Sequence, residues 1–418
     1  MRLTDIPAVA IPDILLPREG TDLKKWAVIA CDQFTSEPEY WEGCDKFVGS
    51  EPSALRIVLP EVKLGIETEE QIENDLKDIA SNINKYISEG IWSAPSEGFI
   101  ITDRSTSLHP SRRGVMLAVD LETYDFTPGN KALVRATEGT VLSRIPPRVK
   151  IRANAAVELP HIMLLYDDPE DKVIGNALKT DPDVIYDTDL MQNSGHITGR
   201  FIPAGSVAAE GIVNDFKSLI SADGLLFAVG DGNHSLASAK AHWENVKKTV
   251  PADQQKTHPA RFALAEAVNI HDKGLDFEPI HRVIFGISKD EFMAKAEEFF
   301  GKDNMAPSES NTGAQSFTVV SEGNEDITVT LRNAPHTLAV GSVQMMIDKY
   351  ELSCDYIHGE DSVRKLSTGN AVGILVPGIS KDTFFSTIET EGVFPRKTFS
   401  MGEAFEKRFY LEARKITL

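Results

Sequence analysis

The stretch from Gly224 to Ser235, GLLFAVGDGNHS, is the part of the sequence that decides the fold. It begins with a short apolar run that is typical of a buried strand. The turn Gly230–Asp231–Gly232 follows directly, and the residues from Leu236 to Val250 have helical spacing without a breaker. We therefore expect a strand, a glycine-containing turn and a helix.

A turn of this kind is a natural seat for an anion, because it presents free backbone N–H groups and the positive end of a helix dipole. Its two glycines let a ligand approach the backbone closely. The candidate phosphate-binding residues are Gly230, Gly232, Asn233 and Ser235, while Asp231 is a candidate metal ligand that could instead orient His234. An ordinary strand-to-helix turn capped by Asn233 or Ser235 has the same spacing, so both interpretations stay open here.

A second cluster lies between Arg135 and Arg152, the most basic segment of the chain. Its cations surround Glu138, and they are Arg135, Arg144, Arg148, Lys150 and Arg152. A carboxylate among cations suits phosphoryl transfer, since the cations offset developing charge and the carboxylate can accept a proton from an attacking hydroxyl. A surface cluster of salt bridges would have the same pattern.

The composition excludes several classes of protein. The 418 residues include 63 acidic and 43 basic side chains, which gives a formal net charge of −20. Such a charge repels phosphate backbones, so we expect no nucleic-acid partner. The apolar and charged fractions are those of a globular chain of two or three domains. No apolar run approaches the ~20 residues of a membrane span, and the N-terminus lacks a signal peptide, so we expect a cytoplasmic protein.

Other motifs carry weaker signals. The three cysteines have no CxxC spacing, which argues against a disulfide framework and a structural zinc site. The acidic run from Asp167 to Asp171 could bind a divalent cation but is more typical of a solvated turn. His161 after Pro160 and His281–Arg282 after Pro279 stand at the heads of apolar runs. The sequence contains no P-loop and no GxGxxG.

The pattern along the chain predicts an α+β fold with two regions. A polar segment from Asn304 to Gly313 is the expected linker, so we predict one region over residues 1–305 and a second over residues 306–418. The predicted elements include helices at Glu69–Glu89, after a capping box at Ser288, and at Lys381–Glu391, and a hairpin formed by Phe317–Val320 and Ile327–Leu331.

Three of these segments resemble a known group of proteins. The segment LLFAVGDGNHSLASAK is similar to the Asp-Gly-His-His-Arg turn of the ParB/sulfiredoxin superfamily, in particular of its free-serine kinases. Ala136–Thr137–Glu138 occupies the place of their Pro-His-Glu motif, and Gly392–Thr398 is similar to the element that ends in their Pro-Lys-Thr-Thr-Arg loop. The whole chain also resembles a large bacterial family of unassigned function near those kinases, some of whose relatives are assigned pyrophosphate as donor.

The sequence departs from the kinase pattern at several positions. Asn233–His234–Ser235 stands where the superfamily has His-His-Arg, and Ser400 stands where the C-terminal loop has arginine. The spacing from Glu138 to Asp231 is longer than in the archaeal kinases, which implies an insertion. Loss of two guanidinium groups requires other cations, from the 144–152 segment or Lys397, to bind phosphate.

The resemblance implies a ParB/sulfiredoxin-like mixed sheet with helices, plus an additional α/β region. It implies a kinase that phosphorylates a small amino acid, free L-serine first, with Mg²⁺ and with pyrophosphate or a nucleotide as donor. Glu138 would take the hydroxyl proton, Asp231 would place Mg²⁺, and His234 would contact the transferred phosphoryl group. The implied phosphate-binding set is Gly230, Gly232, Asn233, Ser235, Arg144 and Arg148, and the implied substrate-binding set is Lys397, Thr398, Ser400, His281 and Arg282.

Two alternatives remain at this stage. The same anion site would serve a metal-dependent phosphatase or other hydrolase with water as acceptor. A non-catalytic nucleotide-binding scaffold, as in the partition-protein branch, would carry a basic helix-turn-helix module, which the sequence does not contain. The donor, the acceptor and the oligomeric state are left open.

Overall fold

The computed structural model describes residues 1–140, 142, 145–305 and 315–418, and it divides into two compact units. The first unit comprises Met1–Leu275 with Glu403–Leu418, and the second comprises Asp276–Gly402. The boundary predicted at residue 305 lies inside the second unit instead. The reason is that β15 (Phe277–Phe285) pairs with β18 (Cys354–His358) and β19 (Ala371–Leu375). Residues 306–314 of the predicted linker lie outside the described residues.

The first unit is built on a large mixed sheet. Its main path runs in the order β11 (Val184–Asp189), β12 (His196–Pro203), β5 (Ser96–Ser105), β6 (Arg112–Asp120), β14 (Phe262–Asn269), β10 (Met163–Tyr166), β13 (Phe227–Asp231), β8 (Val134–Ala136) and β7 (Tyr124–Asp125). The pairs β10–β14, β8–β13 and β7–β8 are parallel, and the other pairs on this path are antiparallel. Short strands β1 (Arg2–Leu3), β2 (Val9–Ile11) and β3 (Asp13–Ile14) add to it through β6 and β5.

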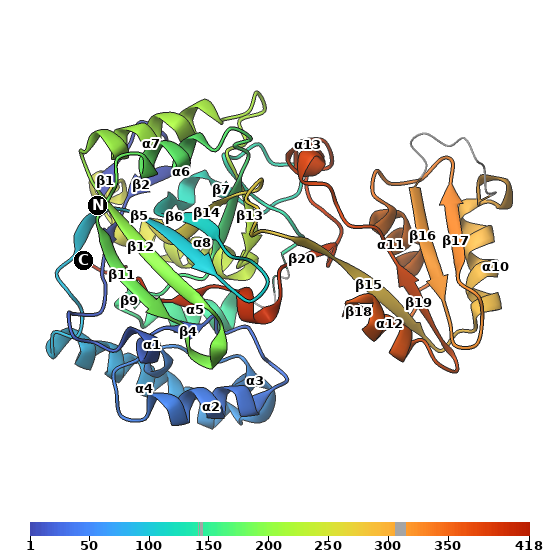
Figure 1. Ribbon diagram of the computed structural model, residues 1–418, viewed down its shortest axis with the longest axis horizontal. Coiled ribbons are helices and arrows are strands. Elements are labelled where there is room, and N and C mark those ends of the chain that lie inside the picture. Colours follow the sequence, from blue (N-terminus) through green and yellow to red (C-terminus); the bar gives the residue numbers. More distant parts are fainter. Residues whose placement is uncertain (141, 143–144, 306–314) are drawn as a thin grey trace. The chain divides into compact units, whose positions relative to one another are not determined.

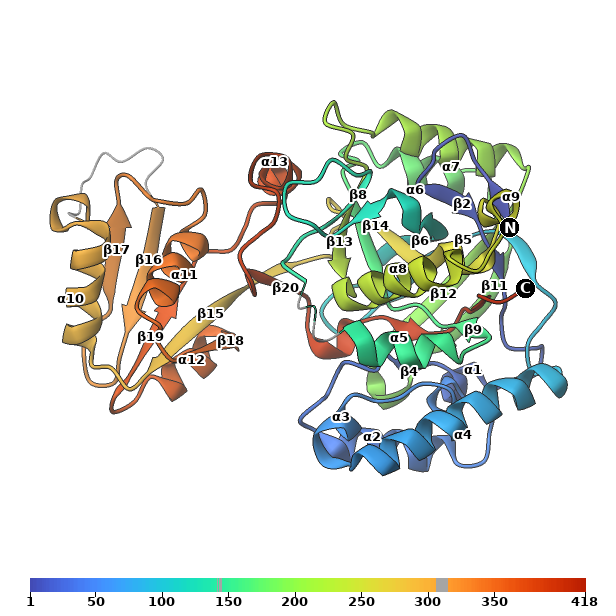
Figure 2. The same cartoon turned by 180° about the vertical axis from the view of Figure 1, so that it is seen from behind.

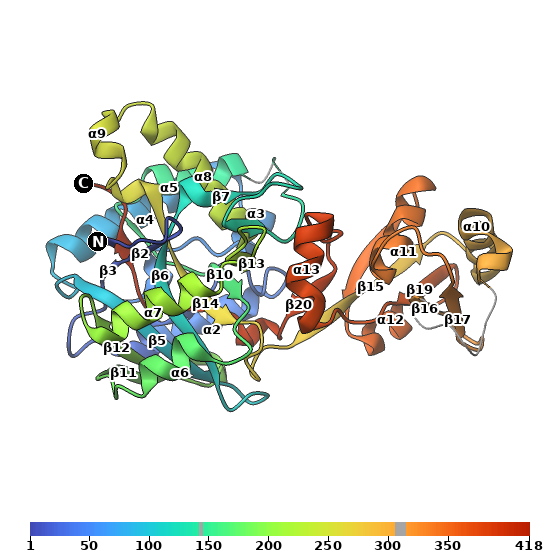
Figure 3. The same ribbon diagram turned by 90° about the horizontal axis from the view of Figure 1, so that it is seen from above.

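Helices cover both faces of this sheet (Figure 1). They are α1 (Leu23–Trp26), α2 (Pro38–Val48), α3 (Val62–Ile66), α4 (Glu69–Ser88), α5 (Ile145–Ala153), α6 (Lys172–Leu178), α7 (Val207–Ser218), α8 (Asn233–Lys247) and α9 (Ala252–Gln255). Because side chains alternate along a strand, Phe99 and Ile101 of β5 join the core with α6, α7 and α8, whereas Ile100 joins the core with α2 and α4. Helix α5 packs along α8 (Figures 2 and 3).

The C-terminal segment returns to the first unit. Strand β21 (Phe409–Tyr410) pairs with β4 (Val28–Ile29), and β22 (Arg414–Lys415) pairs with β9 (Val157–Glu158). Residues 403–418 were predicted to belong with the second region, but these pairings place them in the first.

The second unit has its own sheet, in the order β17 (Ile327–Leu331), β16 (Gln315–Val320), β19, β15 and β18, with β20 (Phe399–Met401) paired to β15. Its helices are α10 (Lys289–Phe300), α11 (Ala339–Lys349), α12 (Glu360–Leu366) and α13 (Lys381–Glu391). The predicted mixture of helices and sheet is confirmed. In the residues that the structure covers, no helix is both long and apolar enough to cross a membrane.

Candidate active site

The parallel pairing of β8 and β13 brings the two predicted motifs to one edge of the sheet. Val134 faces Phe227, and Ala136 faces Val229. The chain leaves both strands at the same end, so Glu138 lies at the edge where Asp231 ends β13. The Thr137 hydroxyl ties the two strand ends together by donating to the carbonyl oxygen of Val229 at 2.6 Å.

The turn after β13 requires its glycine. Gly232 has a φ of +78°, and a Cβ atom there would lie 3.0 Å from the Cα of Ile162. Helix α8 starts at Asn233 with this glycine as its N-cap, and within the described residues no side chain caps its N-terminus. The first backbone bond back to the turn runs from Leu236 to the carbonyl of Gly232. The N–H groups of the preceding helical residues therefore point out of the helix end, as an anion site requires.

Asp231 is an ionised carboxylate held by a lysine. Its Oδ2 lies 3.1 Å from the Nζ of Lys407, and its Oδ1 accepts from the N–H of Gly232 at 2.8 Å. Burial opposes ionisation, but the positive charge of Lys407 outweighs it and lowers the pKa of Asp231. Sequence reasoning missed Lys407 because it comes from the C-terminal segment, far from the turn in sequence.

Three other polar groups stand at this edge. Glu138 is half-buried immediately after β8, and His234 is half-buried in the first turn of α8, where its carbonyl accepts from Ser238. The Oδ1 atom of Asn233 is buried and, among the atoms that the structure describes, has no hydrogen-bond partner. A buried acceptor of this kind is costly unless a ligand or water satisfies it.

Ser235 belongs to a chain of hydrogen bonds. Its Oγ lies 2.8 Å from the Nε2 of His161, and the Nδ1 of the same imidazole lies 2.7 Å from the hydroxyl of Tyr410. The N–H of Cys31 donates to that hydroxyl at 3.1 Å. The position of His161 at the head of an apolar run was noticed in the sequence, whereas Tyr410 gave no signal.

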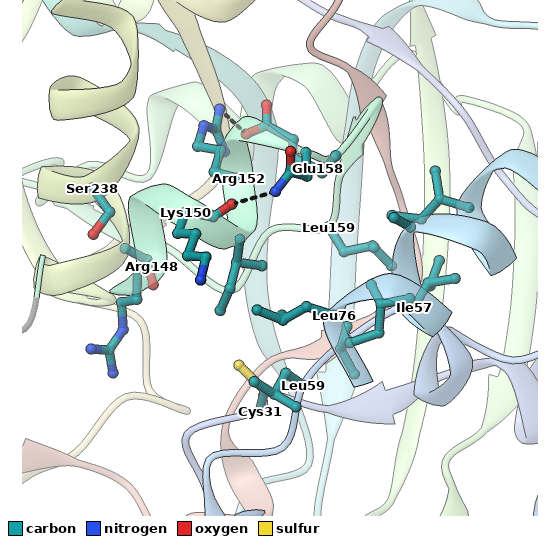
Figure 4. Close-up of a pocket in the computed structure, with 18 of the residues that line it drawn as sticks. Cys31, Ile57, Leu59, Leu76, Arg148, Lys150, Arg152, Glu158, Leu159 and Ser238 are labelled. Atoms are coloured by element: carbon teal, nitrogen blue, oxygen red, sulfur yellow. Dashed lines mark hydrogen bonds and ion pairs between the residues drawn. The ribbon is translucent and has the colours of Figure 1, made fainter. Parts of the chain in front are cut away.

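A cavity of about 710 Å³ opens beside this chain, and Ser235, His161 and Tyr410 line it. The apolar face of α4 forms one wall, with Ile72, Leu76, Ile79 and Ile83. Figure 4 shows Leu76, Ile57 and Leu159 across from Ser238 and Arg148. The cavity is therefore mainly apolar, with charged residues both on α4, at Glu69 and Glu73, and on α5.

The basic segment is largely neutralised by acidic partners. Arg148 pairs with Glu61, Lys150 with Glu73 at 3.2 Å, and Arg152 with Glu158 at 2.6 Å. Buried Arg135 pairs with Asp223 at 2.8 Å, and neither residue belongs to the turn over residues 230–235. Arg144 lies outside the described residues. The cations that the structure places are thus held in salt bridges, but not all of these lie at the surface, because Arg135 is buried and Arg152 pairs with buried Glu158.

The predicted substrate-binding residues lie in the second unit, on β15, on β20 and in the turn before β20. Arg282 is buried and donates to the carbonyls of Lys397, at 3.0 Å, and Arg396, while the Thr398 hydroxyl donates to Pro395 at 2.6 Å. His281 accepts from the N–H of Val376, and Ser400 lies opposite Glu278 between β15 and β20. These contacts stabilise the turn from 395 to 398, and a role of these residues in substrate binding stays a prediction.

The donor set can be compared with what a metal ion requires. Within the described ranges, no three His, Cys, Asp or Glu side chains are grouped to hold a metal ion. Mg²⁺ needs only one or two protein carboxylates when phosphate oxygens supply further ligands. Asp231, which is ionised, fits that limited role. The acidic run gives no metal site, because Asp168 caps the start of α6 through Val173, Asp167 contacts His271 and Asp171 contacts Arg113.

The fold and this edge define the first unit as a mixed-sheet domain with a candidate anion site at a helix N-terminus. A family model described as "Protein of unknown function (DUF1015)" matches residues 15–350, so the chain belongs to that family. No curated protein matches the chain in sequence.

Solved structures with partial likeness include three proteins at low identity. SbnI with a C-terminal truncation from Staphylococcus aureus is 12% identical over 69% of this chain and 82% of that one, with a TM-score of 0.36. A conserved hypothetical protein from Pyrococcus furiosus is 10% identical over 72% and 95%, with a TM-score of 0.35. A mutant free serine kinase in complex with ADP is 10% identical over 72% and 92%, with a TM-score of 0.39.

Proposed function

We propose that this protein is a phosphotransferase that phosphorylates the hydroxyl of a small amino acid, free L-serine first, with pyrophosphate or a nucleotide as donor. The observation that carries the proposal is the parallel register of β8 and β13, which brings Glu138 to the edge where α8 presents its uncapped N-terminus. A carboxylate base and an anion seat at one edge are the two parts that phosphoryl transfer needs. The ParB/sulfiredoxin-like assignment of the sheet is part of this proposal.

The donor phosphates would bind the N–H groups at the start of α8. Gly230 and Gly232 allow close approach, and the backbone of Asn233 and Ser235 supplies donors. Ser235 stands where the resembling kinases have an arginine, and Lys407 would supply a positive charge at the turn in its place. Lys407 lies at the turn itself, 3.1 Å from Asp231, so we assign it the main cationic role, while a phosphate-binding role of Arg148, which pairs with Glu61, stays a prediction.

The acceptor would bind between Glu138 and the turn. The partnerless Oδ1 of Asn233 is a hydrogen-bond acceptor, so it suits the ammonium group of an amino acid. Glu138 would take the proton of the hydroxyl as its oxygen attacks phosphorus. The new O–P bond replaces the bond to the donor oxygen, which leaves with the rest of the donor, and His234 would contact the phosphoryl group in transit.

Mg²⁺, when bound, would neutralise the donor phosphates. Asp231 is the residue that would hold it, since its carboxylate is ionised and lies at the turn. The ion pair with Lys407 keeps this carboxylate in position.

The proposal is tested by incubating the purified full-length protein with serine, Mg²⁺ and either pyrophosphate, ADP or ATP. Phosphoserine should form with at least one donor, detected by ³¹P NMR and mass spectrometry. Lys407→Met should raise the KM for that donor, whereas Lys240→Met, in the half-buried i,i+4 pair of α8 with Glu244, should not. Absence of phosphoserine with all three donors would refute the proposal.

A further inference from the structure

The hydrogen-bonded chain beside the cavity has the arrangement of a nucleophile, a base and a group that orients the base. Ser235 Oγ and His161 Nε2 are 2.8 Å apart, and His161 Nδ1 and the Tyr410 hydroxyl are 2.7 Å apart. Both separations lie within the roughly 2.6–3.2 Å at which a base can take the proton of a serine. All three residues line the same cavity.

The surroundings of Tyr410 favour the imidazole tautomer that a base needs. The phenol is 2% exposed and is fixed by β21 against β4. Burial comes first among the causes that raise its pKa well above the ordinary value, so the phenol stays neutral. Its oxygen accepts a hydrogen bond from the N–H of Cys31. A second lone pair on the phenol oxygen is then available to the Nδ1–H of His161, which leaves Nε2 to accept from Ser235.

Ser235 also sits where a developing negative charge is stabilised. It is the third residue of α8, whose N-terminus carries the positive end of the helix dipole. The cavity volume of about 710 Å³ falls in the range of roughly 300–1,000 Å³ that is typical of small-molecule sites. Because its walls are mainly apolar, with many Ile, Leu and Val side chains, it suits an apolar acyl chain.

We propose that Ser235 and His161 form a catalytic pair, positioned by Tyr410, that hydrolyses esters whose apolar acyl chain occupies the cavity. Ser235 Oγ attacks the ester carbonyl carbon while His161 Nε2 takes the hydroxyl proton. The bond to the alkoxy oxygen breaks, and His161 returns the proton to the leaving alcohol. Water then attacks the acyl group, His161 takes its proton and passes it to Ser235 Oγ, and a carboxylic acid is released. This activity is independent of phosphoryl transfer.

The test uses the intact protein with p-nitrophenyl butyrate, hexanoate and decanoate. Nitrophenol release should exceed the buffer rate and should fall at least about 100-fold in Ser235→Ala and in His161→Gln. The matched control is Ser238→Ala, because Ser238 lines the same cavity from the same helix but donates to the carbonyl of His234. That variant should retain the wild-type rate. Hydrolysis that does not exceed the buffer rate, or equal rates in Ser235→Ala and the wild type, would overturn the proposal.

Two further measurements separate catalysis from a structural role. An alkyl fluorophosphonate should add covalently to Ser235, located by peptide mass spectrometry, and an adduct only on another residue would contradict the assignment. Tyr410→Phe keeps the ring but removes the hydroxyl that orients His161. It should lower kcat about 10-fold at unchanged KM, with an unchanged tryptophan fluorescence spectrum as evidence of folding. An unchanged kcat would remove Tyr410 from the set.

Discussion

Two buried arginines, one in each unit, are held in different ways. In the first unit, Arg408 lies 3.1 Å from Glu266 and also pairs with Glu412, and none of the three is more than 4% exposed. In the second unit, buried Arg282 donates instead to backbone carbonyls of the chain around it. Carbonyl partners come with the backbone, whereas Arg408 depends on the Glu266 side chain from another segment of the chain.

The C-terminal segment supplies most of those charges. Arg408 and Glu412 complete the cluster with Glu266 on β14, and Arg414 binds Glu158 at 2.6 Å. Lys407 from the same segment holds Asp231 at the candidate active site. The comparison teaches that in the first unit, a buried charge cluster and the candidate site depend on the same returning stretch of chain, whereas Arg282 of the second unit is held by the backbone carbonyls of Arg396 and Lys397 in its own unit.

Removing Arg408 should have the largest effect on stability. Arg408→Met leaves Glu266 and Glu412 buried without their cation, so we expect a loss of about 3–5 kcal/mol in the free energy of unfolding. The protein's four tryptophans, Trp26, Trp41, Trp92 and Trp243, all lie in the first unit, so urea unfolding followed by their fluorescence reports on that unit.

The control for this prediction is Arg56→Met, also in the first unit. Arg56 pairs with Asp45 at the surface, and such pairs contribute about 0–1 kcal/mol. Equal losses in the two variants would contradict the claim that the first unit depends on its buried charges.

A buried histidine should make the first unit sensitive to acid. Burial, and then the positive charge of Arg152, lower the pKa of His242 from its ordinary 6.5 to about 4. As the pH falls below 6.5, the unfolded chain binds a proton that the folded protein binds only near pH 4. Stability should therefore fall between these pH values, by up to about 3 kcal/mol. Tryptophan-monitored unfolding of the wild type and His242→Leu should show a shallower pH dependence in the variant, and parallel curves would rule this out.

A smaller effect is expected at the turn. Gly232→Ala puts a Cβ at a φ of +78° and 3.0 Å from the Cα of Ile162, so it should cost about 2 kcal/mol. Gly139→Ala, on the other side of the candidate site, meets no atom within 4 Å and has no such φ. It should leave the unfolding midpoint nearly unchanged. If both variants unfold alike, the strained turn is not what shapes this edge.

Local elements could be predicted well from the sequence. The helix predicted over Glu69–Glu89 is α4, and the capping box at Ser288 starts α10 with Glu291 as its partner. Helix α13 and the β16–β17 hairpin also lie where expected. These features depend on neighbours within a few residues, which periodicity and capping reveal.

Long-range pairings could not be predicted in this way. Strands β11 and β12 lie in a polar stretch before Phe201, where the residue pattern indicates no strand. The boundary predicted near residue 305 is wrong because β15, which precedes it, pairs within the second sheet. Lys407 and Tyr410 reach the candidate site through pairing of β21 with β4, which leaves no local pattern. The turn and Glu138 were predicted from their local residue patterns and by resemblance, and the register of β8 and β13 brings them to one edge.

The most direct test of the account is the rate of phosphoserine formation in Glu138→Gln. If Glu138 is the base at the edge shared with α8, this variant should lose about 100-fold or more of the wild-type kcat with an unchanged tryptophan unfolding curve. Glu210→Gln, an exposed carboxylate on α7, should keep the wild-type rate. A Glu138→Gln protein that forms phosphoserine as fast as the wild type would contradict the central claim.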